Sequence, residues 1–231
     1  MKFLISFFVW ILVLTIEPTA ILPISEATTV DQPQPANIRI DHDILAENQP
    51  LRWTMLDVLR GTGIPAGVAE ITGCADLSRA HLRLKQGTSV HEAMDALVAA
   101  NPSYQWRLEG GVVNLTPRAG VPILDTRIAN FQMDATGREI ALFFQDLLRL
   151  PEVRAREAAL SLKQGYWSGG PGAADEHPVP KQLVPVRITV QNLSLREAFN
   201  KIVLVSGRTI WTYHETDCNG SRTYIVGVAS D

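Results

Sequence analysis

The chain has 231 residues, of which 46% are hydrophobic and 19% charged, and its formal net charge is −3. This balance is typical of a globular protein, and it excludes a disordered tail and a nucleic-acid binder that relies on net positive charge. Because the charges nearly cancel, we expect no nucleic-acid partner. Two cysteines are too few for a cysteine metal cluster.

The N-terminus, residues 1–27, is predicted to be a signal peptide. Its hydrophobic run, residues 3–16, is shorter than the roughly 20 residues of a membrane span. Ser25 and Ala27 supply small residues before a cut at Thr28. We expect a periplasmic or secreted protein with no membrane span in the mature chain; an uncleaved anchor built on the same run is the alternative.

Cys74 and Cys218 lie in different halves of the chain. In an oxidising compartment they would form one disulfide between the halves. Two free thiols or an intermolecular bond are the alternatives, because pairing depends on geometry that spacing does not give.

The first half begins with an extended lead-in at residues 28–37. Ile38 and Ile40 then alternate with polar residues and predict a strand. A helix is expected from Pro50, a residue suited to a helix start, to a stop at Gly61. Two short strand-like segments follow this helix: residues 64–71 and 81–87.

A repeat organises the rest of the chain. Residues 89–106 align without a gap to residues 194–211, at an offset of 105 residues. Each copy opens on a Ser followed three positions later by a Glu, which predicts a capping box, and continues with an apolar stripe at helical spacing. We interpret both stripes as core. The capping residues are Ser89 with Glu92 and Ser194 with Glu197.

Each predicted helix is followed by a predicted hairpin. Residues 104–117 turn at Gly110 and Gly111, and residues 209–230 turn at Asn219–Gly220, a dipeptide that tolerates positive φ. The large aromatics at matched positions, Trp106 and Trp211, are predicted to cover the helices as core residues.

The second half repeats the order of the first. Its expected features are a strand at 124–133, a third capping box at Thr136 with Glu139, and a helix closed by Pro151. Residues 164–183, rich in Gly and Pro, form a long loop absent from the first half. The predicted fold class is α+β.

The predicted architecture is two tandem αβ modules, residues 38–118 and 122–231. Each module has the order strand, helix, strand, strand, helix, hairpin. This layout, with the motifs at 89–97 and 194–202, resembles the short N-terminal domain of secretins and TonB-dependent receptors. The resemblance implies a periplasmic module that contacts other proteins. The helical pattern at 151–162 departs from the strand that the family has there.

The sequence offers no catalytic constellation, so we expect no enzyme, no cofactor and no metal site. No nucleophile elbow or zinc-type HExxH motif accompanies the histidines. In Asp41–His42–Asp43, strand alternation would separate the imidazole from both carboxylates. The polar cluster from His214 to Cys218 is explained by the adjoining turn. The histidines are His42, His81, His91, His177 and His214.

The candidate partner contacts are Tyr166 and Trp167 in the long loop and Tyr224 on a hairpin edge, where a partner would pair by strand addition. We expect a non-catalytic pair of interaction modules, an adaptor or accessory in a cell-envelope secretion or transport assembly with envelope proteins as partners. The alternatives are a secreted hydrolase or sugar-binding protein with a site at the module junction, and a membrane-anchored regulator.

Overall fold

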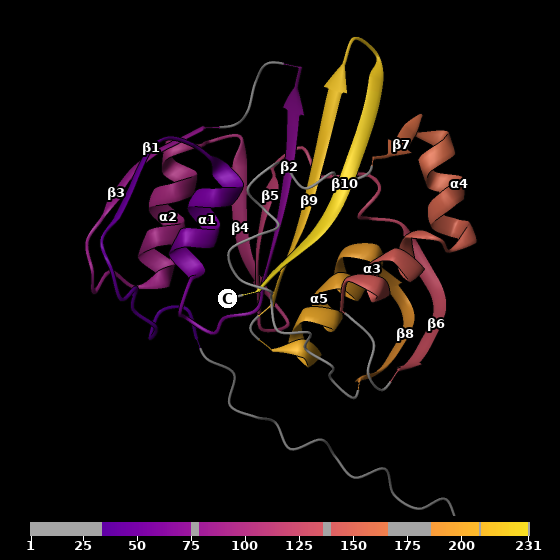
Figure 1. The fold of residues 1–231 in the computed structure, drawn as a ribbon, viewed down its shortest axis with the longest axis horizontal. Coiled ribbons are helices and arrows are strands. Elements are labelled where there is room, and N and C mark those ends of the chain that lie inside the picture. Colours follow the sequence, from indigo (N-terminus) through magenta and orange to yellow (C-terminus); the bar gives the residue numbers. More distant parts are fainter. Residues whose placement is uncertain (1–33, 75–78, 136–139, 166–185, 208, 231) are drawn as a thin grey trace, which may run out of the picture. The chain divides into compact units, whose positions relative to one another are not determined.

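The structure, a computed structural model, describes residues 34–74, 79–135, 140–165, 186–207 and 209–230 (Figure 1). These residues have an α+β fold, as predicted. The described residues form one compact unit. None of the helices within these ranges is long and apolar enough to cross a membrane.

The first half begins its regular structure later than the sequence predicted. The strand expected at Ile38 is wrong: Arg39 makes only an isolated bridge to Ser89. Ile40 is buried in a loop, where its amide donates to the Thr88 carbonyl. The elements are β1 (Ile44–Pro50), α1 (Leu51–Leu59), β2 (Ala66–Gly73), β3 (Arg79–Leu84), α2 (Val90–Ala100), β4 (Tyr104–Glu109) and β5 (Val112–Pro117).

The second half has the predicted order with one additional helix. The helical pattern after Leu150 is a helix with Pro151 at its first position, a favourable place for proline. The capping box predicted at Thr136 and Glu139 lies outside the described residues. The elements are β6 (Arg127–Ala135), α3 (Ile140–Leu148), α4 (Pro151–Ala159), β7 (Leu162–Gln164), β8 (Val186–Ser194), α5 (Leu195–Ser206), β9 (Thr209–Cys218) and β10 (Ser221–Ser230).

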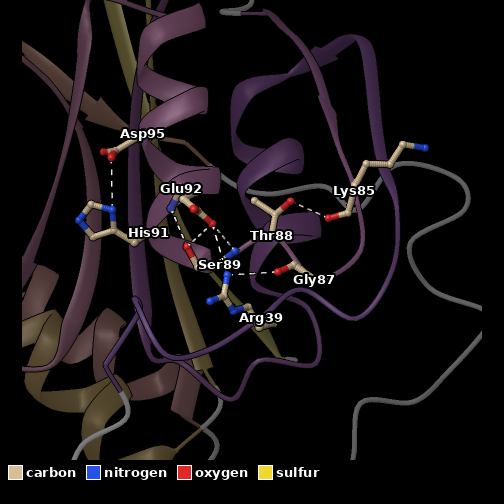
Figure 2. A network of polar contacts seen from close by, with 8 residues as sticks. All are labelled: Arg39, Lys85, Gly87, Thr88, Ser89, His91, Glu92 and Asp95. Atoms are coloured by element: carbon tan, nitrogen blue, oxygen red, sulfur yellow. Dashed lines mark hydrogen bonds and ion pairs between the residues drawn. The ribbon is translucent and has the colours of Figure 1, made fainter.

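The two capping boxes of the repeat are confirmed. The Glu92 amide donates to the Ser89 hydroxyl at 3.1 Å, and the Glu92 carboxylate accepts from the Ser89 amide at 2.9 Å (Figure 2). At the start of α5 the Glu197 amide donates to Ser194 at 3.2 Å in the same arrangement. Each box satisfies amides that a helix N-terminus would otherwise leave unpaired.

The main sheet joins the two halves of the chain. Its strand order is β4-β5-β2-β9-β10-β7, and β2 of the first half runs parallel to β9 of the second (Figure 1). The register between them extends from Ala66 opposite Ile210 to Gly73 opposite Asp217. Two further pairs, β1 with β3 and β6 with β8, form separate two-stranded sheets. The two predicted modules are therefore not confirmed as separate units.

The helices of the two halves pack on opposite faces of this shared sheet. The core cluster around α1 and α2 includes Ile210, whereas the cluster around α3 and α5 includes its neighbour Trp211. Because successive side chains of a strand alternate between faces, β9 contributes to both cores. Figure 1 shows α1 and α2 on one side of the sheet and α3 and α5 on the other.

A disulfide fixes one end of the junction between β2 and β9. Cys74 directly follows β2 and bonds to Cys218, the last residue of β9, with their Cα atoms 4.7 Å apart. Of the alternatives that the sequence left open, the structure has the single bond between the halves.

Candidate functional site

The junction between the halves holds a buried carboxylate, Glu70 of β2. Its side chain is fully buried, and its Oε2 lies 3.2 Å from the Arg52 guanidinium and 3.2 Å from Nδ1 of His214. Glu70 and His214 meet because they are register partners on adjacent parallel strands. A buried carboxylate needs such partners, since desolvation of an unpaired charge is costly. Three segments far apart in the sequence are thus tied together.

A small hollow of about 180 Å³ lies beside this cluster. Trp53 of α1 lines this hollow, and 45% of its surface is exposed. The Arg52 guanidinium lies 5.7 Å from the centre of the Trp53 ring. The opposite wall comes from β9 and β10. The lining residues are Arg52, Trp53, Leu56, Thr212, His214, Ile225, Gly227, Val228 and Ala229.

Two other buried carboxylates belong to the interior of the second half. Glu215 accepts from the Tyr213 hydroxyl at 2.5 Å and from both Nε and Nη2 of Arg222. Burial, and then the hydrogen bond to Glu215, raise the pKa of Tyr213 well above its usual range. Glu157 accepts from the Tyr224 hydroxyl and, at 2.8 Å, from Arg154. These groups satisfy one another, whereas Oε1 of Glu70 has no protein partner within the described residues.

The polar segment from His214 to Cys218 does not converge on one point. Strand alternation sends His214 toward Glu70 and Glu215 to the other face, where Arg222 binds it. Cys218 is in the disulfide. Among the described residues there is no group of three or more His, Cys, Asp or Glu side chains placed to hold a metal ion.

The alternation argument for residues 41–43 is wrong. These residues form a bend before β1 rather than a strand, and Nδ1 of His42 lies 2.6 Å from Oδ1 of Asp41. This contact and the hydrogen bond that the Asp43 carboxylate accepts from the Gln86 amide hold the pKa of both carboxyls below the usual range.

The second candidate is the outer edge of the main sheet, formed by β4. This strand ends the sheet order of the described residues. Trp106 is half-buried against α2, where its indole N–H donates to Asp95 at 2.8 Å and its ring meets His91 edge-on at 5.0 Å. Figure 2 shows His91 and Asp95 one turn apart on that helix. Leu108 is 38% exposed.

The direction of the backbone groups along β4 follows from its pairing with β5. The Arg118 amide donates to the Ser103 carbonyl at 2.8 Å, so this pair, next to Tyr104 and Pro117 in the register, is a hydrogen-bonded one. In an antiparallel ladder such pairs alternate with pairs whose amides and carbonyls point outward. The backbone groups of Trp106 and Leu108 therefore point to the open edge, and those of Arg107 point to β5.

The structure corrects the prediction that Tyr224 is a partner contact on a hairpin edge. It is fully buried in β10 between β9 and β7, stacks on Tyr213 at 5.5 Å, and its carbonyl accepts from the Gly165 amide at 2.7 Å. Tyr224 therefore does not lie on an open edge, because β7 pairs with it there. Tyr166 and Trp167, the other predicted contacts, lie outside the described residues.

The sequence interpretation overestimated the burial of Trp106, which packs against the core around α1 and α2 but stays partly exposed. The prediction that both matched tryptophans are core holds for Trp211, which is fully buried, but Trp106 is only half-buried. The repeat alone could not distinguish them, because burial depends on which strand lies beside each. The Glu in the apolar run of residues 64–71 was the available signal for the buried Glu70.

Comparison of the chain with models of known protein families, with curated proteins and with solved structures finds no match. The resemblance to the short N-terminal domain of secretins and TonB-dependent receptors stays a prediction.

Proposed function

We propose that this chain is an exported, non-catalytic interaction protein, an adaptor or accessory in a cell-envelope secretion or transport assembly, and that it captures protein partners by strand addition at β4. The observation that carries the proposal is that, among the described residues, no further strand pairs with β4 on the side to which the backbone groups of Trp106 and Leu108 point. An edge strand presents unpaired amides and carbonyls that an extended partner segment can satisfy.

The side chains of β4 favour this use of the edge. Natural proteins protect exposed edges with charges, prolines or a covering segment. The two residues of β4 whose backbone groups point to the edge, Trp106 and Leu108, are instead large and apolar, with the exposed Arg107 between them. A half-buried aromatic beside an exposed leucine is typical of an interaction site, because aromatic residues contribute strongly to binding energy.

Export is supported by the hydrophobic run at residues 3–16 and the small residues before Thr28. The bond between Cys74 and Cys218 also favours an oxidising compartment, since structural disulfides are rare in the cytosol. Both features fit a periplasmic or secreted location.

Site-specific crosslinking in intact envelopes tests the proposal. A photoreactive residue at position 108 should capture partner proteins, whereas one at Ala158, exposed on α4, should not. Leu108→Pro removes an outward amide and should abolish capture in a folded protein, because an edge strand tolerates proline on its open side. Equal capture from both positions, or undiminished capture after Leu108→Pro, would contradict the proposal.

A matched variant separates binding from folding. Arg107→Pro removes an amide that faces β5, so it should lower the melting temperature, which Leu108→Pro should leave nearly unchanged. Loss of capture with an intact melting temperature at Leu108 is the expected signature of an open edge.

The hollow beside Glu70 favours a second candidate, a secreted sugar-binding protein or hydrolase with a site at the junction of the halves. An exposed aromatic next to a guanidinium is suited to stacking on a sugar and donating to its hydroxyls. Titration calorimetry with soluble envelope oligosaccharides tests it. Binding that Trp53→Ala abolishes would favour this function, and no heat with any sugar would count against it.

A further inference from the structure

In each copy of the repeat, the tryptophan side chain contacts the side chain of the helix residue eleven positions earlier. Trp106 donates its indole N–H to Asp95 at 2.8 Å, and Trp211 donates to Asn200 at 2.7 Å. Asp95 and Asn200 occupy matched positions of the repeat, as the two tryptophans do. Each indole is therefore held over its own helix in the same way, and the two differ in what lies beside the strand.

At Trp211 the neighbouring strand is β2, and the residue opposite is Gly67. A Cβ atom placed on Gly67 would lie 1.9 Å from Cε2 of Trp211. The indole thus lies directly against the Gly67 backbone, which only glycine allows. This contact completes the burial of Trp211.

At Trp106 no described strand takes the place of β2. The repeat equates β4 with β9, and both direct their tryptophan backbone groups away from their hairpin partner. We propose that β4 binds an extended segment of another protein, parallel to β4, with a glycine opposite Trp106 and a basic residue opposite Glu109. This inference rests on the proposed function and specifies the partner strand.

The basic residue follows from the charges along the two strands. In the register of the junction, Glu70 lies opposite His214, three positions after the tryptophan. The matched position on β4 is Glu109, whose carboxylate lies 3.5 Å from Arg196. A glutamate opposite Glu109 would be repelled, whereas Lys or Arg would form a cross-strand pair.

The described residues of a second copy do not supply such a strand. β2 itself is buried between β5 and β9. In the second half the strand that corresponds to β2 is β7, which pairs with β10 only from Arg222 to Tyr224. It does not reach Gly227, which lies next to the residue of β10 that is opposite Trp211. Because no strand of the described residues offers such a glycine at an open edge, we assign the strand to a different protein.

Fluorescence anisotropy of the intact chain with labelled peptides tests the strand rule. The probe is the sequence of residues 66–73 with Glu70→Lys. We expect this peptide to bind, and we expect Gly67→Val in the peptide to weaken binding at least tenfold. Restoring Glu70 in the peptide should weaken binding about threefold at low salt, and this difference should vanish at high salt. Trp106→Ala in the protein should abolish the preference for glycine.

Several results would overturn the inference. Equal binding of the glycine and valine peptides would do so without any change to the protein, so misfolding of a variant cannot obscure it. If photocrosslinking at position 108 captures envelope proteins while the peptides show no glycine preference, the strand rule fails and the proposed function stands. If position 108 captures no protein and the peptides show no glycine preference, the proposed function and the strand rule are both wrong. A dimer in sedimentation equilibrium that Leu108→Pro dissolves would assign the edge to a second copy instead.

Discussion

Trp106 and Trp211 occupy matched positions of the repeat, yet one is half-buried at a sheet edge and the other fully buried at the centre of the sheet. The two copies share Ser, Glu, Ala, Val and Trp at matched positions, and they have the same helix cap and the same indole hydrogen bond. The difference comes from β2, which lies beside Trp211, whereas no strand of the described part of the chain lies in the same place beside Trp106. The fate of a residue in a repeat is thus set by its non-local neighbour.

The most direct way to break the comparison is to truncate each tryptophan. Trp211→Ala should cost about 4 kcal/mol of unfolding free energy, because it opens a cavity between α5 and β2 and leaves Asn200 without its donor. Trp106→Ala should cost about 1 kcal/mol, since its ring is partly solvated already. Denaturant unfolding measures both. Equal costs would show that the two sites are not energetically different.

The disulfide provides the next test of the junction. Reduction should cost about 3 kcal/mol, because Cys74 and Cys218 close a loop with a sequence separation of 144 residues. The double variant Cys74→Ser with Cys218→Ser should have the melting temperature of the reduced protein and should not respond to reductant. A melting temperature of the native chain that reductant does not change would contradict this bond.

Gly67 tests the close approach of the strands themselves. Gly67→Val should cost about 2 kcal/mol or more by overpacking, because the new Cβ would overlap the Trp211 ring. Gly73, at the end of the same strand, is the control, since a Cβ there would meet nothing within 4 Å. Gly73→Ala should therefore leave thermal unfolding within about 0.5 kcal/mol of the native value. Similar losses at both glycines would argue against the contact.

Local signals predicted most of the elements. The two capping boxes of the repeat, the turn at Asn219–Gly220 and the stop after α1 rest on interactions within a few positions, and the structure has all of these. The strand at Ile38 was misplaced because four alternating residues also fit a buried loop.

What the sequence could not predict is how the halves meet. Parallel pairing of β2 with β9 joins residues far apart in the chain and leaves no periodic signal of its own. The cluster of Glu70 with His214 depends on that register, and so does the difference between the tryptophans. The burial of Tyr224 similarly depends on β7, a strand of three residues too short to recognise from its pattern.

The smallest expected effect concerns the two capping boxes, the feature in which the two halves should behave alike. Ser89→Ala and Ser194→Ala should each cost about 1 kcal/mol at neutral pH, because each removes the acceptor for an N-terminal helix amide. The two costs should match within about 0.5 kcal/mol, since additive local effects do not depend on the neighbouring strand. A cost at one serine only would show that the boxes are not equivalent.

The pH dependence of these two variants sharpens the same test. The Ser89 hydroxyl first, and then its amide, lower the pKa of Glu92; the Ser194 amide first, and then its hydroxyl, lower that of Glu197. A carboxyl whose pKa is lower in the folded state stabilises the fold fully above its unfolded pKa of about 4.3, and this stabilisation is lost as the pH falls through the folded value. Both serine substitutions should therefore cost less in acid than at pH 7, because the protonated Glu no longer favours the Ser hydroxyl as a donor. Urea unfolding of the native chain and both variants between pH 7 and pH 3 measures this change, and a cost that stays constant in acid would assign the whole effect to the helix amide.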